Sequence, residues 1–368
     1  MTTVANEPER IAALDGVRGL AILFVLVMHS LYIGPLVGLD VGAHPYARVA
    51  WLGWCGVDVF FVLSGFLITG ILVRSKGGPG YFRNFYMRRA LRIFPLYYAV
   101  VALLLFVLPR PLITSADYLP HLLYYQNFRY AYGLLAGHDA ALQVTWSLAI
   151  EEQFYLLWPA LVWCLSTRAL RALCVAAILA AVGMRFYLVG QGLPGTHFLT
   201  HCRLDTLAAG ALLAISPRPG AWLGWVLAPL GLVGLVVTAF ACGISVPFAP
   251  AMQQWGLLCT LALGVGVLTL ARASTALQPM FGLLPLRSLG KYSYCIYLTH
   301  MLVVEWLGAR AQSLGGDLPR VVQALSPLGC TVAFTLAVVG CSWLLALLSY
   351  HLFERWFLAL KRYFPSGG

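Results

Sequence analysis

Charge is scarce in this sequence. Charged residues make up 10% of its 368 positions, whereas a soluble domain carries about 25%. The sequence also has no long polar block. Hydrophobic residues make up 61% of it, and the mean hydropathy is +0.83. These shortages exclude an ordinary soluble enzyme. They predict an all-α polytopic membrane protein in which a single domain occupies the whole chain, 1–368.

Paired cysteines and internal repeats are absent as well. The nine cysteines form no CxxC pair and show no Cys/His spacing typical of a metal site, so we expect buried thiols and no metal. The missing repeat argues against the inverted-repeat architecture of many transporters. A net charge of +11 would suggest nucleic-acid binding in a soluble protein. In a membrane protein Lys and Arg mark cytoplasmic loops instead, and we expect no nucleic-acid partner.

What the sequence does contain is a series of apolar segments, each close to the roughly 20 residues that cross a bilayer as a helix. Ten such segments can be counted. They lie at about 17–37, 50–73, 90–108, 144–165, 169–189, 199–216, 221–241, 251–271, 286–308 and 326–350.

Basic residues are distributed unevenly between alternate connections. If the N-terminus is cytoplasmic, the inner loops and tails hold Arg10, Arg74, Lys76, Arg83, Arg88, Arg89, Arg168, Arg171, Arg218, Arg272, Lys361 and Arg362. The outer loops hold Arg48, Arg110, Arg129, Arg310 and Arg320. The positive-inside rule therefore supports ten spans with both termini in the cytoplasm. We expect the longest outer loop, 109–143, to cover the outer mouth as a lid.

Ionisable residues inside the spans are candidate functional residues, because each costs about 2.5–3.5 kcal/mol to insert. Arg18 and His29 lie eleven residues apart, which places them on one helix face about 16 Å from each other. A snorkelling arginine and a structurally satisfied histidine explain this pair as well as a site does. The other ionisable residues favour a site, because they fall near the depth of His29 and outline a chamber in the outer half of the membrane. They are Asp58, Glu151, Arg203, Asp205 and His300.

The densest run of charge is 74–92, with six basic residues and no acidic one. Arg88, Arg89 and Arg92 are spaced so that their side chains gather on one helix surface. Such a cluster commonly sets topology and binds anionic lipids. Alternatively, because guanidinium groups bind phosphate oxygens in pairs, the cluster forms a polyphosphate site together with Arg18.

Five motifs follow one another along the chain. They are LDGVRGL at 14–20 with His29 after it, GVDVFFVLSGF at 56–66, RRALRIFP at 88–95, WSLAIEEQFY at 146–155 and YSYCIYLTH at 292–300. In this order they resemble the acyltransferase-3 family of integral membrane O-acyltransferases, over about residues 10–357. The resemblance implies a ten-helix domain in the bacterial cytoplasmic (inner) membrane. It implies transfer of an acyl group, usually acetyl, from cytoplasmic acyl-CoA to a hydroxyl of a glycan, a lipid-linked saccharide or a small molecule.

The resemblance also assigns roles to residues. It makes His29 the essential histidine and Arg18 its paired arginine, and it makes Glu151, rather than its neighbour Glu152, the acid of the fourth span. The donor-binding basic motif is Arg88, Arg89 and Arg92. The chamber residues that would contact substrate are Trp146, Arg203, Asp205, Tyr297 and His300. Some members carry an esterase-like domain that does not occur before Gly368, so we expect the membrane domain, or a separate periplasmic or oligomeric partner, to serve the acceptor.

These assignments predict a mechanism in which only the acyl group crosses the membrane. Acetyl-CoA would rest its phosphates on the arginine cluster and extend its thioester arm toward His29, which acts as general base on the acceptor hydroxyl. Either Glu151 or Asp58 would stabilise the imidazolium. Arg203 would polarise the thioester carbonyl or, as we favour, pair with Asp205. Direct transfer is favoured over a covalent acyl-enzyme on Ser64 or His29.

Two other functions compete with this one. In a proton-coupled transporter or flippase, His29, Glu151 and Asp205 would form a proton relay; the missing repeat and the dense arginine cluster argue against it. The number of intramembrane charges argues against a scaffold without chemistry. The acceptor stays open among surface polysaccharides, lipopolysaccharide side chains, periplasmic glucans and hydroxylated antibiotics, and the acyl group between acetyl, succinyl and longer chains.

Overall fold

The computed structural model describes residues 7–31, 45–108, 112–133, 139–193, 195–243, 248–314 and 326–365. Every secondary-structure element within these ranges is a helix, which confirms the all-α class. Arg110 and Arg320 lie outside the described residues.

The long helices are α1 (Glu7–Ser30), α3 (Cys55–Ser75), α4 (Tyr81–Ala102), α8 (Trp146–Cys164), α9 (Thr167–Gly190), α10 (Thr200–Ile215), α11 (Ala221–Ala241), α12 (Leu257–Ala273), α14 (Leu284–Leu314) and α16 (Pro327–Ser349). Shorter helices connect or extend them: α2 (Pro45–Trp51), η2 (Leu52–Trp54), η3 (Leu103–Val107), α5 (Ser115–Leu122), α6 (Gln126–Ala131), α7 (Ala140–Gln143), η4 (Thr196–Phe198), η5 (Met252–Gly256), α13 (Gln278–Phe281), η7 (Tyr350–Glu354), α17 (Arg355–Ala359) and η8 (Leu360–Tyr363).

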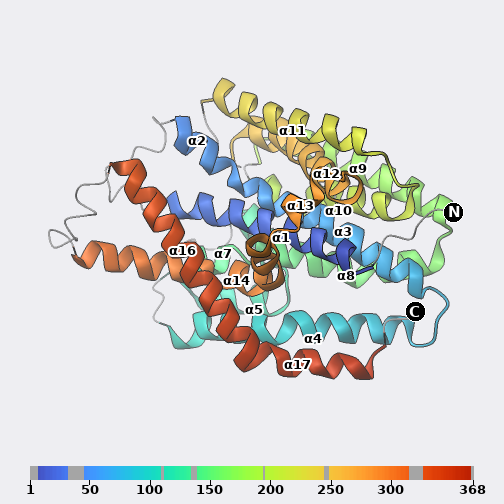
Figure 1. Ribbon diagram of the computed structural model, residues 1–368, viewed down its shortest axis with the longest axis horizontal. Coiled ribbons are helices and arrows are strands. Elements are labelled where there is room, and N and C mark those ends of the chain that lie inside the picture. The colour runs from blue at the N-terminus through green and yellow to red at the C-terminus, as the bar shows by residue number, and fades with distance from the viewer. Residues whose placement is uncertain are drawn as a thin grey trace.

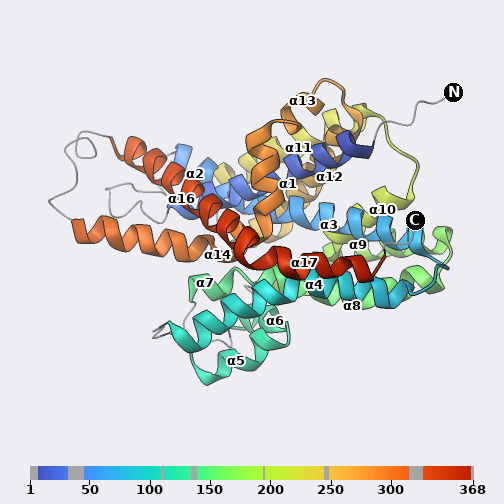
Figure 2. The same ribbon diagram turned by 60° about the horizontal axis from the view of Figure 1, so that its bottom comes forward.

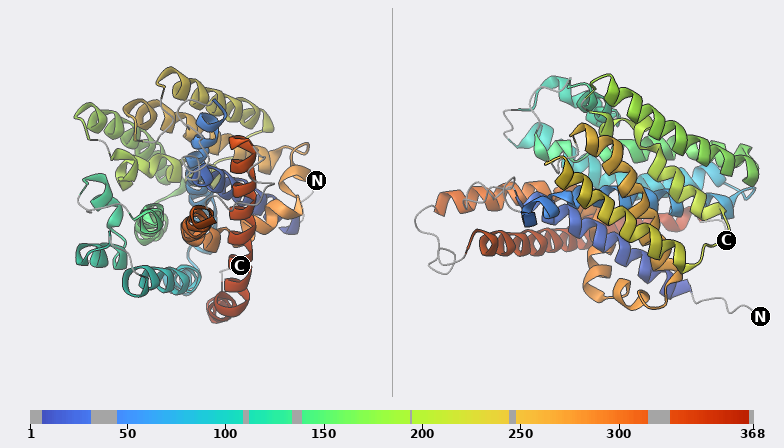
Figure 3. Two further views of the ribbon diagram at one scale, coloured as in Figure 1. Left: turned by 90° about the vertical axis from the view of Figure 1, so that its left-hand side faces the viewer. Right: turned by 90° about the horizontal axis from the view of Figure 1, so that it is seen from above.

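The long helices form an elongated bundle (Figure 1). The first described helix, α1, begins and the last, η8, ends at the same end of this bundle, which we call the terminal end; α14 ends and α16 begins at the opposite end. The helices α5, α6 and α7, from the predicted lid, pack against α4, α8 and α14 on one side of the bundle (Figure 2). The end-on view shows α1 surrounded by other helices (Figure 3).

The described residues hold seven helical stretches that are long and apolar enough to cross a membrane. They are Ala12–Ser30, Pro45–Ser75, Tyr81–Val107, Thr167–Gly190, Ala221–Ala241, Met252–Ala273 and Pro327–Tyr363. These confirm a multi-pass integral membrane protein. The other three predicted spans coincide with α8, α10 and α14; α10 has only 16 residues, and α8 and α14 carry charges such as Glu151 and Lys291. The count of ten and the side on which the termini lie stay predictions.

Glycines in two of the motifs let the central helices touch backbone to backbone. A Cβ atom at Gly16 would overlap the carbonyl oxygen of Phe281 in α13, and one at Gly19 would overlap that of Leu286 in α14. Gly65 lets α3 approach α10 in the same way. Because close-packed interiors do not absorb such overlaps, these glycines fix how the helices that carry the polar residues lie against one another.

Candidate functional site

Two histidines meet where α1 and α14 pack together. The Nε2 atom of His300 lies 3.1 Å from the Nδ1 atom of His29, and the ring centroids are 4.7 Å apart. Each ring is also hydrogen-bonded to a main-chain carbonyl group of its own helix. Nδ1 of His300 lies 2.7 Å from the carbonyl oxygen of Tyr297, and Nδ1 of His29 lies 3.0 Å from that of Val25.

These contacts define the tautomers of the two rings. A carbonyl oxygen can only accept, so Nδ1 of His300 carries a hydrogen and its Nε2 atom accepts when the ring is neutral. Nδ1 of His29 then donates, shared between the Val25 carbonyl and Nε2 of His300. It follows that a neutral His29 has its proton-accepting lone pair on Nε2, the atom a general base would use.

His29 lines a cavity of about 140 Å³, which we call the histidine cavity. Four other predicted residues line it from four different helices: Asp58, Trp146, Arg203 and Tyr297. The structure therefore gathers side chains from α1, α3, α8, α10 and α14 around one space.

Aromatic side chains form much of the remaining wall of the histidine cavity. Trp51, His197, Phe198 and Phe248 all line it, and the ring centroids of Trp146 and Phe198 lie 5.3 Å apart. Burial lowers the pKa of His197 to about 3, so this ring stays neutral. An uncharged aromatic wall with a few polar groups is typical of a site for a flat or ring-shaped ligand.

A second cavity, of about 120 Å³, lies nearer the terminal end and is named here the arginine cavity. Arg18, Arg89 and Arg92 line it together with Ser64 and Glu151. The guanidinium carbon of Arg89 lies 5.7 Å from the ring centroid of Tyr155. The carboxylate of Glu151 accepts a hydrogen bond from the Ser64 hydroxyl.

Tyr297 and Val57 line both cavities, so they form the wall between them. The Tyr297 hydroxyl donates to the carbonyl oxygen of Val144 at 2.9 Å. Its single hydrogen is thereby used, so the Ser147 hydroxyl, 2.7 Å away, donates to the Tyr297 oxygen. These two hydrogen bonds tie the tyrosine to the segment that leads into α8.

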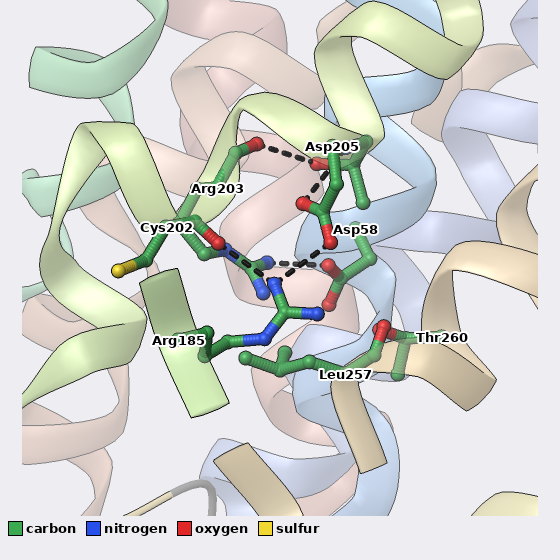
Figure 4. Close-up of polar contacts among 8 residues, drawn as sticks. Asp58, Arg185, Cys202, Arg203, Asp205, Leu257 and Thr260 are labelled. Atoms are coloured by element: carbon green, nitrogen blue, oxygen red, sulfur yellow. Dashed lines mark hydrogen bonds and ion pairs between the residues drawn. The ribbon is translucent and has the colours of Figure 1, made fainter. Parts of the chain in front are cut away.

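Two buried ion pairs stand beside the histidine cavity (Figure 4). Arg203 pairs with Asp58, and Asp205 accepts from Arg185 at 2.7 Å; the predicted pair of Arg203 with Asp205 is therefore wrong. Arg203 and Asp205 are two residues apart on α10, so their side chains lie about 200° apart around the helix and reach different neighbours. Among the described residues, Nε and Nη1 of Arg203 have no hydrogen-bond partner.

Comparison with known proteins identifies the family of this chain. A family model described as an acyltransferase domain, of the acyltransferase-3 family, matches residues 11–347. The chain belongs to the acyltransferase-3 family. No solved structure matches it significantly.

Curated relatives of this acyltransferase-3 chain are named as O-acetyltransferases. It is 29% identical to the peptidoglycan O-acetyltransferase OatA of Listeria monocytogenes, over 80% of this chain and 49% of OatA. It is 28% identical to YrhL of Bacillus subtilis, named a putative peptidoglycan O-acetyltransferase, over 94% of this chain and 54% of YrhL. The chain thus spans about half the length of these relatives.

The structure separates some of the residues predicted for this acyltransferase site. Arg88 does not line the arginine cavity; it donates to the carbonyl oxygen of Phe364 at 3.0 Å. Glu151 lines the arginine cavity and not the histidine cavity. Asp205 and His300 line neither cavity. Asp205 accepts a hydrogen bond from Arg185, and His300 contacts the ring of His29.

Sequence reasoning missed Arg185 and the aromatic wall. Arg185 is fully buried, and the rule that flags charges inside apolar spans applies to it as it does to Arg203. No sequence pattern marks the aromatic wall as a site, because aromatic residues gather near the ends of membrane spans, at the membrane–water interface, in many membrane proteins. The wall residues concerned are Trp51, His197, Phe198 and Phe248.

Proposed function

We propose that this chain is a membrane O-acyltransferase of the bacterial cytoplasmic membrane that transfers an acetyl group from acetyl-CoA to a hydroxyl of a cell-surface glycan. One observation carries the proposal. A cavity lined by three arginines and a cavity lined by a histidine of defined tautomer meet at a shared wall, Tyr297 and Val57.

The arginine cavity suits the donor. Coenzyme A carries phosphate groups at one end and a thioester at the end of a long, thin arm. Arg18, Arg89 and Arg92 offer guanidinium groups that bind phosphate oxygens. Since α1 is one continuous helix from Glu7 to Ser30, Arg18 and His29 are about 16 Å apart along it, a distance that the arm can span. The terminal end of the bundle would then face the cytoplasm.

The histidine cavity suits the acceptor. Sugar rings present flat apolar faces, and the walls of Trp146, Phe198 and Phe248 offer aromatic surfaces to them. The relatives' names, which specify peptidoglycan for two of them, support a glycan as acceptor. Peptidoglycan itself is the first candidate.

The reaction follows from the tautomer of His29. Nε2 of His29 takes the proton of the acceptor hydroxyl, and the hydroxyl oxygen attacks the thioester carbonyl. The carbon–sulfur bond breaks, and the leaving sulfur of coenzyme A takes the proton back. While His29 is an imidazolium, its Nδ1–H still donates to Val25 and His300, which stabilises the charge. Direct transfer of this kind requires no acyl-enzyme.

Arg203 has the geometry of a carbonyl-binding group in this reaction. It is almost fully buried, it lines the histidine cavity, and only one edge of its guanidinium group is used by Asp58. A hydrogen on Nε or on Nη1 would stabilise the oxygen that becomes negative as the thioester is attacked. Asp58 thus holds Arg203 in place rather than assisting His29 directly.

The test is transfer by the purified protein in detergent, with radiolabelled acetyl-CoA and soluble peptidoglycan fragments. We expect label to move to the fragments with the wild-type protein, and His29→Ala to abolish transfer while the protein keeps its unfolding temperature. The exposed variant Arg168→Gln serves as the control. Full transfer by His29→Ala would remove His29 from the mechanism, and a wild-type protein that neither transfers the acetyl group nor hydrolyses acetyl-CoA would favour the transporter.

A further inference from the structure

His197 is a buried histidine whose ring nitrogens have no hydrogen-bond partner. Its side chain is 4% exposed. Among the residues that the structure describes, neither ring nitrogen of His197 forms a hydrogen bond, and Nδ1 is buried. Buried polar groups in proteins are nearly always hydrogen-bonded, so this ring calls for a partner that is not part of the described chain.

The other two buried histidines use both of their ring nitrogens. Nδ1 of His121 lies 2.6 Å from the carbonyl oxygen of Asp117, and its Nε2 atom lies 3.1 Å from the hydroxyl of Tyr130. Both nitrogens of His300 are hydrogen-bonded as well. His121 and His300 are therefore satisfied by the fold, whereas His197 is not.

The main chain around His197 is held by Gln253 of η5. Oε1 of Gln253 accepts from the hydroxyl of Thr196 and from the main-chain N–H of His197 at 3.3 Å. Nε2 of Gln253 donates to the carbonyl oxygen of Phe248 at 2.9 Å. One side chain thus fixes both η4 and Phe248, which are two parts of the aromatic wall.

Three aromatic rings hold the ring of His197. Its centroid lies 3.9 Å from that of Phe198, 4.7 Å from that of Phe248 and 5.6 Å from that of Trp146. A phenylalanine would make the same kind of contacts without bringing unbonded polar atoms into the interior. Packing alone therefore does not account for a histidine at this position.

His197 lines the histidine cavity, as do His29 and Arg203. Burial, and to a lesser extent the charge of Arg203, lowers the pKa of His197 to about 3, so the ring is neutral at physiological pH. A neutral imidazole has one N–H donor and one lone pair that accepts. A hydroxyl group both donates and accepts, so it can bond to either ring nitrogen.

We propose that His197 binds a second hydroxyl group of the acceptor, beside the hydroxyl that His29 deprotonates. This inference rests on the proposed function and narrows the acceptor to a compound with several hydroxyl groups, such as a sugar. The second hydroxyl supplies the partner that the ring lacks, while the surrounding aromatic rings contact the apolar face of the sugar. His197 is thus a binding residue for the acceptor and takes no part in binding acetyl-CoA.

The kinetic test compares His197→Phe with His197→Gln, using acetyl-CoA and soluble peptidoglycan fragments. His197→Phe keeps an aromatic ring without hydrogen-bonding atoms. It should raise the KM for the fragments about fivefold to tenfold, the loss of about one hydrogen bond, and leave the KM for acetyl-CoA unchanged. His197→Gln should recover part of the loss, because its amide both donates and accepts.

The unfolding temperature of the purified protein provides a readout that does not depend on transfer. His197→Phe removes a buried polar group that has no partner, so it should raise the unfolding temperature. His121→Phe is the matched control: it removes two hydrogen bonds that are formed and should lower the unfolding temperature. A drop in His197→Phe as large as that in His121→Phe would make His197 a structural residue and overturn the proposal.

The outcomes distinguish a failure of this inference from a failure of the proposed function. Normal transfer by the wild type, with an unchanged KM for the fragments in His197→Phe, would overturn this inference alone. An equal rise in the KM values of both substrates would also overturn it, because His197 would then support the whole site. No transfer by the wild type would overturn the proposed function and this inference with it.

Discussion

His29 and His300 form a directional pair: Nδ1 of His29 donates toward Nε2 of His300 at 3.1 Å, and Nδ1 of His300 donates to the carbonyl oxygen of Tyr297. The donation runs from the ring of His29, which lines the histidine cavity, through His300 to the main-chain carbonyl of Tyr297 in α14. Its direction leaves the lone pair of His29 on Nε2, which is the requirement for a general base.

His300 is therefore a positioning residue. His300→Ala should lower kcat by about tenfold to a hundredfold with little change in the KM for acetyl-CoA, a loss similar to that caused by removing the orienting partner of a metal-bound histidine. His300→Gln should recover part of the activity, because its side-chain oxygen accepts from His29 while its amide donates to Tyr297. Equal losses in the two variants, or a change confined to KM, would contradict this role. Steady-state kinetics of both variants make the comparison.

The two buried ion pairs provide a matched test of which arginine takes part in chemistry. Removing one partner, as in Asp58→Leu or Asp205→Leu, leaves a buried arginine charge and should destabilise the protein by about 3–5 kcal/mol. Replacing both members of a pair by apolar residues should restore most of that stability. Chemical unfolding in detergent measures these changes.

Activity should distinguish the two double variants. Arg185→Met with Asp205→Leu removes the pair that does not line the histidine cavity, so transfer should persist. Arg203→Met with Asp58→Leu should be stable but should lose transfer by about a hundredfold or more, the cost of removing one donor to a developing oxyanion. Equal activity in both double variants would assign Arg203 a structural role alone.

Arg88 and Arg92 differ in what they contact, although they lie one helical turn apart. Arg92→Gln should raise the KM for acetyl-CoA about tenfold or more, because a guanidinium contact to phosphate is lost. Arg88→Gln should leave this KM unchanged, since Arg88 donates to the main chain at Lys361 and Phe364. It should instead make the C-terminal segment easier to digest with a protease. An unchanged donor requirement in Arg92→Gln would mean that the cluster serves lipids or topology.

The motif glycines are expected to be structural. Gly16→Ala should destabilise the protein by about 1–3 kcal/mol or more, because the added methyl group meets the main chain of α13, which cannot move aside. Gly183→Ala is the matched control: it lies within α9, a Cβ there meets nothing within 4 Å, and it should stabilise the helix by up to about 1 kcal/mol. The unfolding temperatures of the two variants should therefore move in opposite directions.

The all-α membrane class could be predicted from the sequence, because insertion into a bilayer constrains the composition and the length of each helix. It constrains far less which side chains contact one another. The ends of the α9, α10 and α11 segments agree with prediction within a few residues, since turn-forming residues flank them. The gathering of His29, Asp58 and Arg203 around one cavity could be predicted from depth, the one coordinate that a count of residues along a span supplies.

The ion-pair and hydrogen-bond partners of the site residues could not be predicted from the sequence in the same way. Depth does not tell which way a side chain points, so Arg203 was paired with Asp205 on its own helix rather than with Asp58 across the interface. The hydrogen bond between Glu151 and Ser64 joins α8 to α3 and depends on how the helices are rotated about their axes.

The central claim, that an acetyl group passes from a donor on the terminal side to an acceptor on the other side, is tested most directly in sealed vesicles of known protein orientation. Radiolabelled acetyl-CoA is placed on the side of the terminal end, and peptidoglycan fragments on the opposite side. The account predicts labelled fragments on the far side, coenzyme A retained on the near side, and no labelled fragments with His29→Ala. Labelling that requires both substrates on one side, or that persists in His29→Ala, would contradict it.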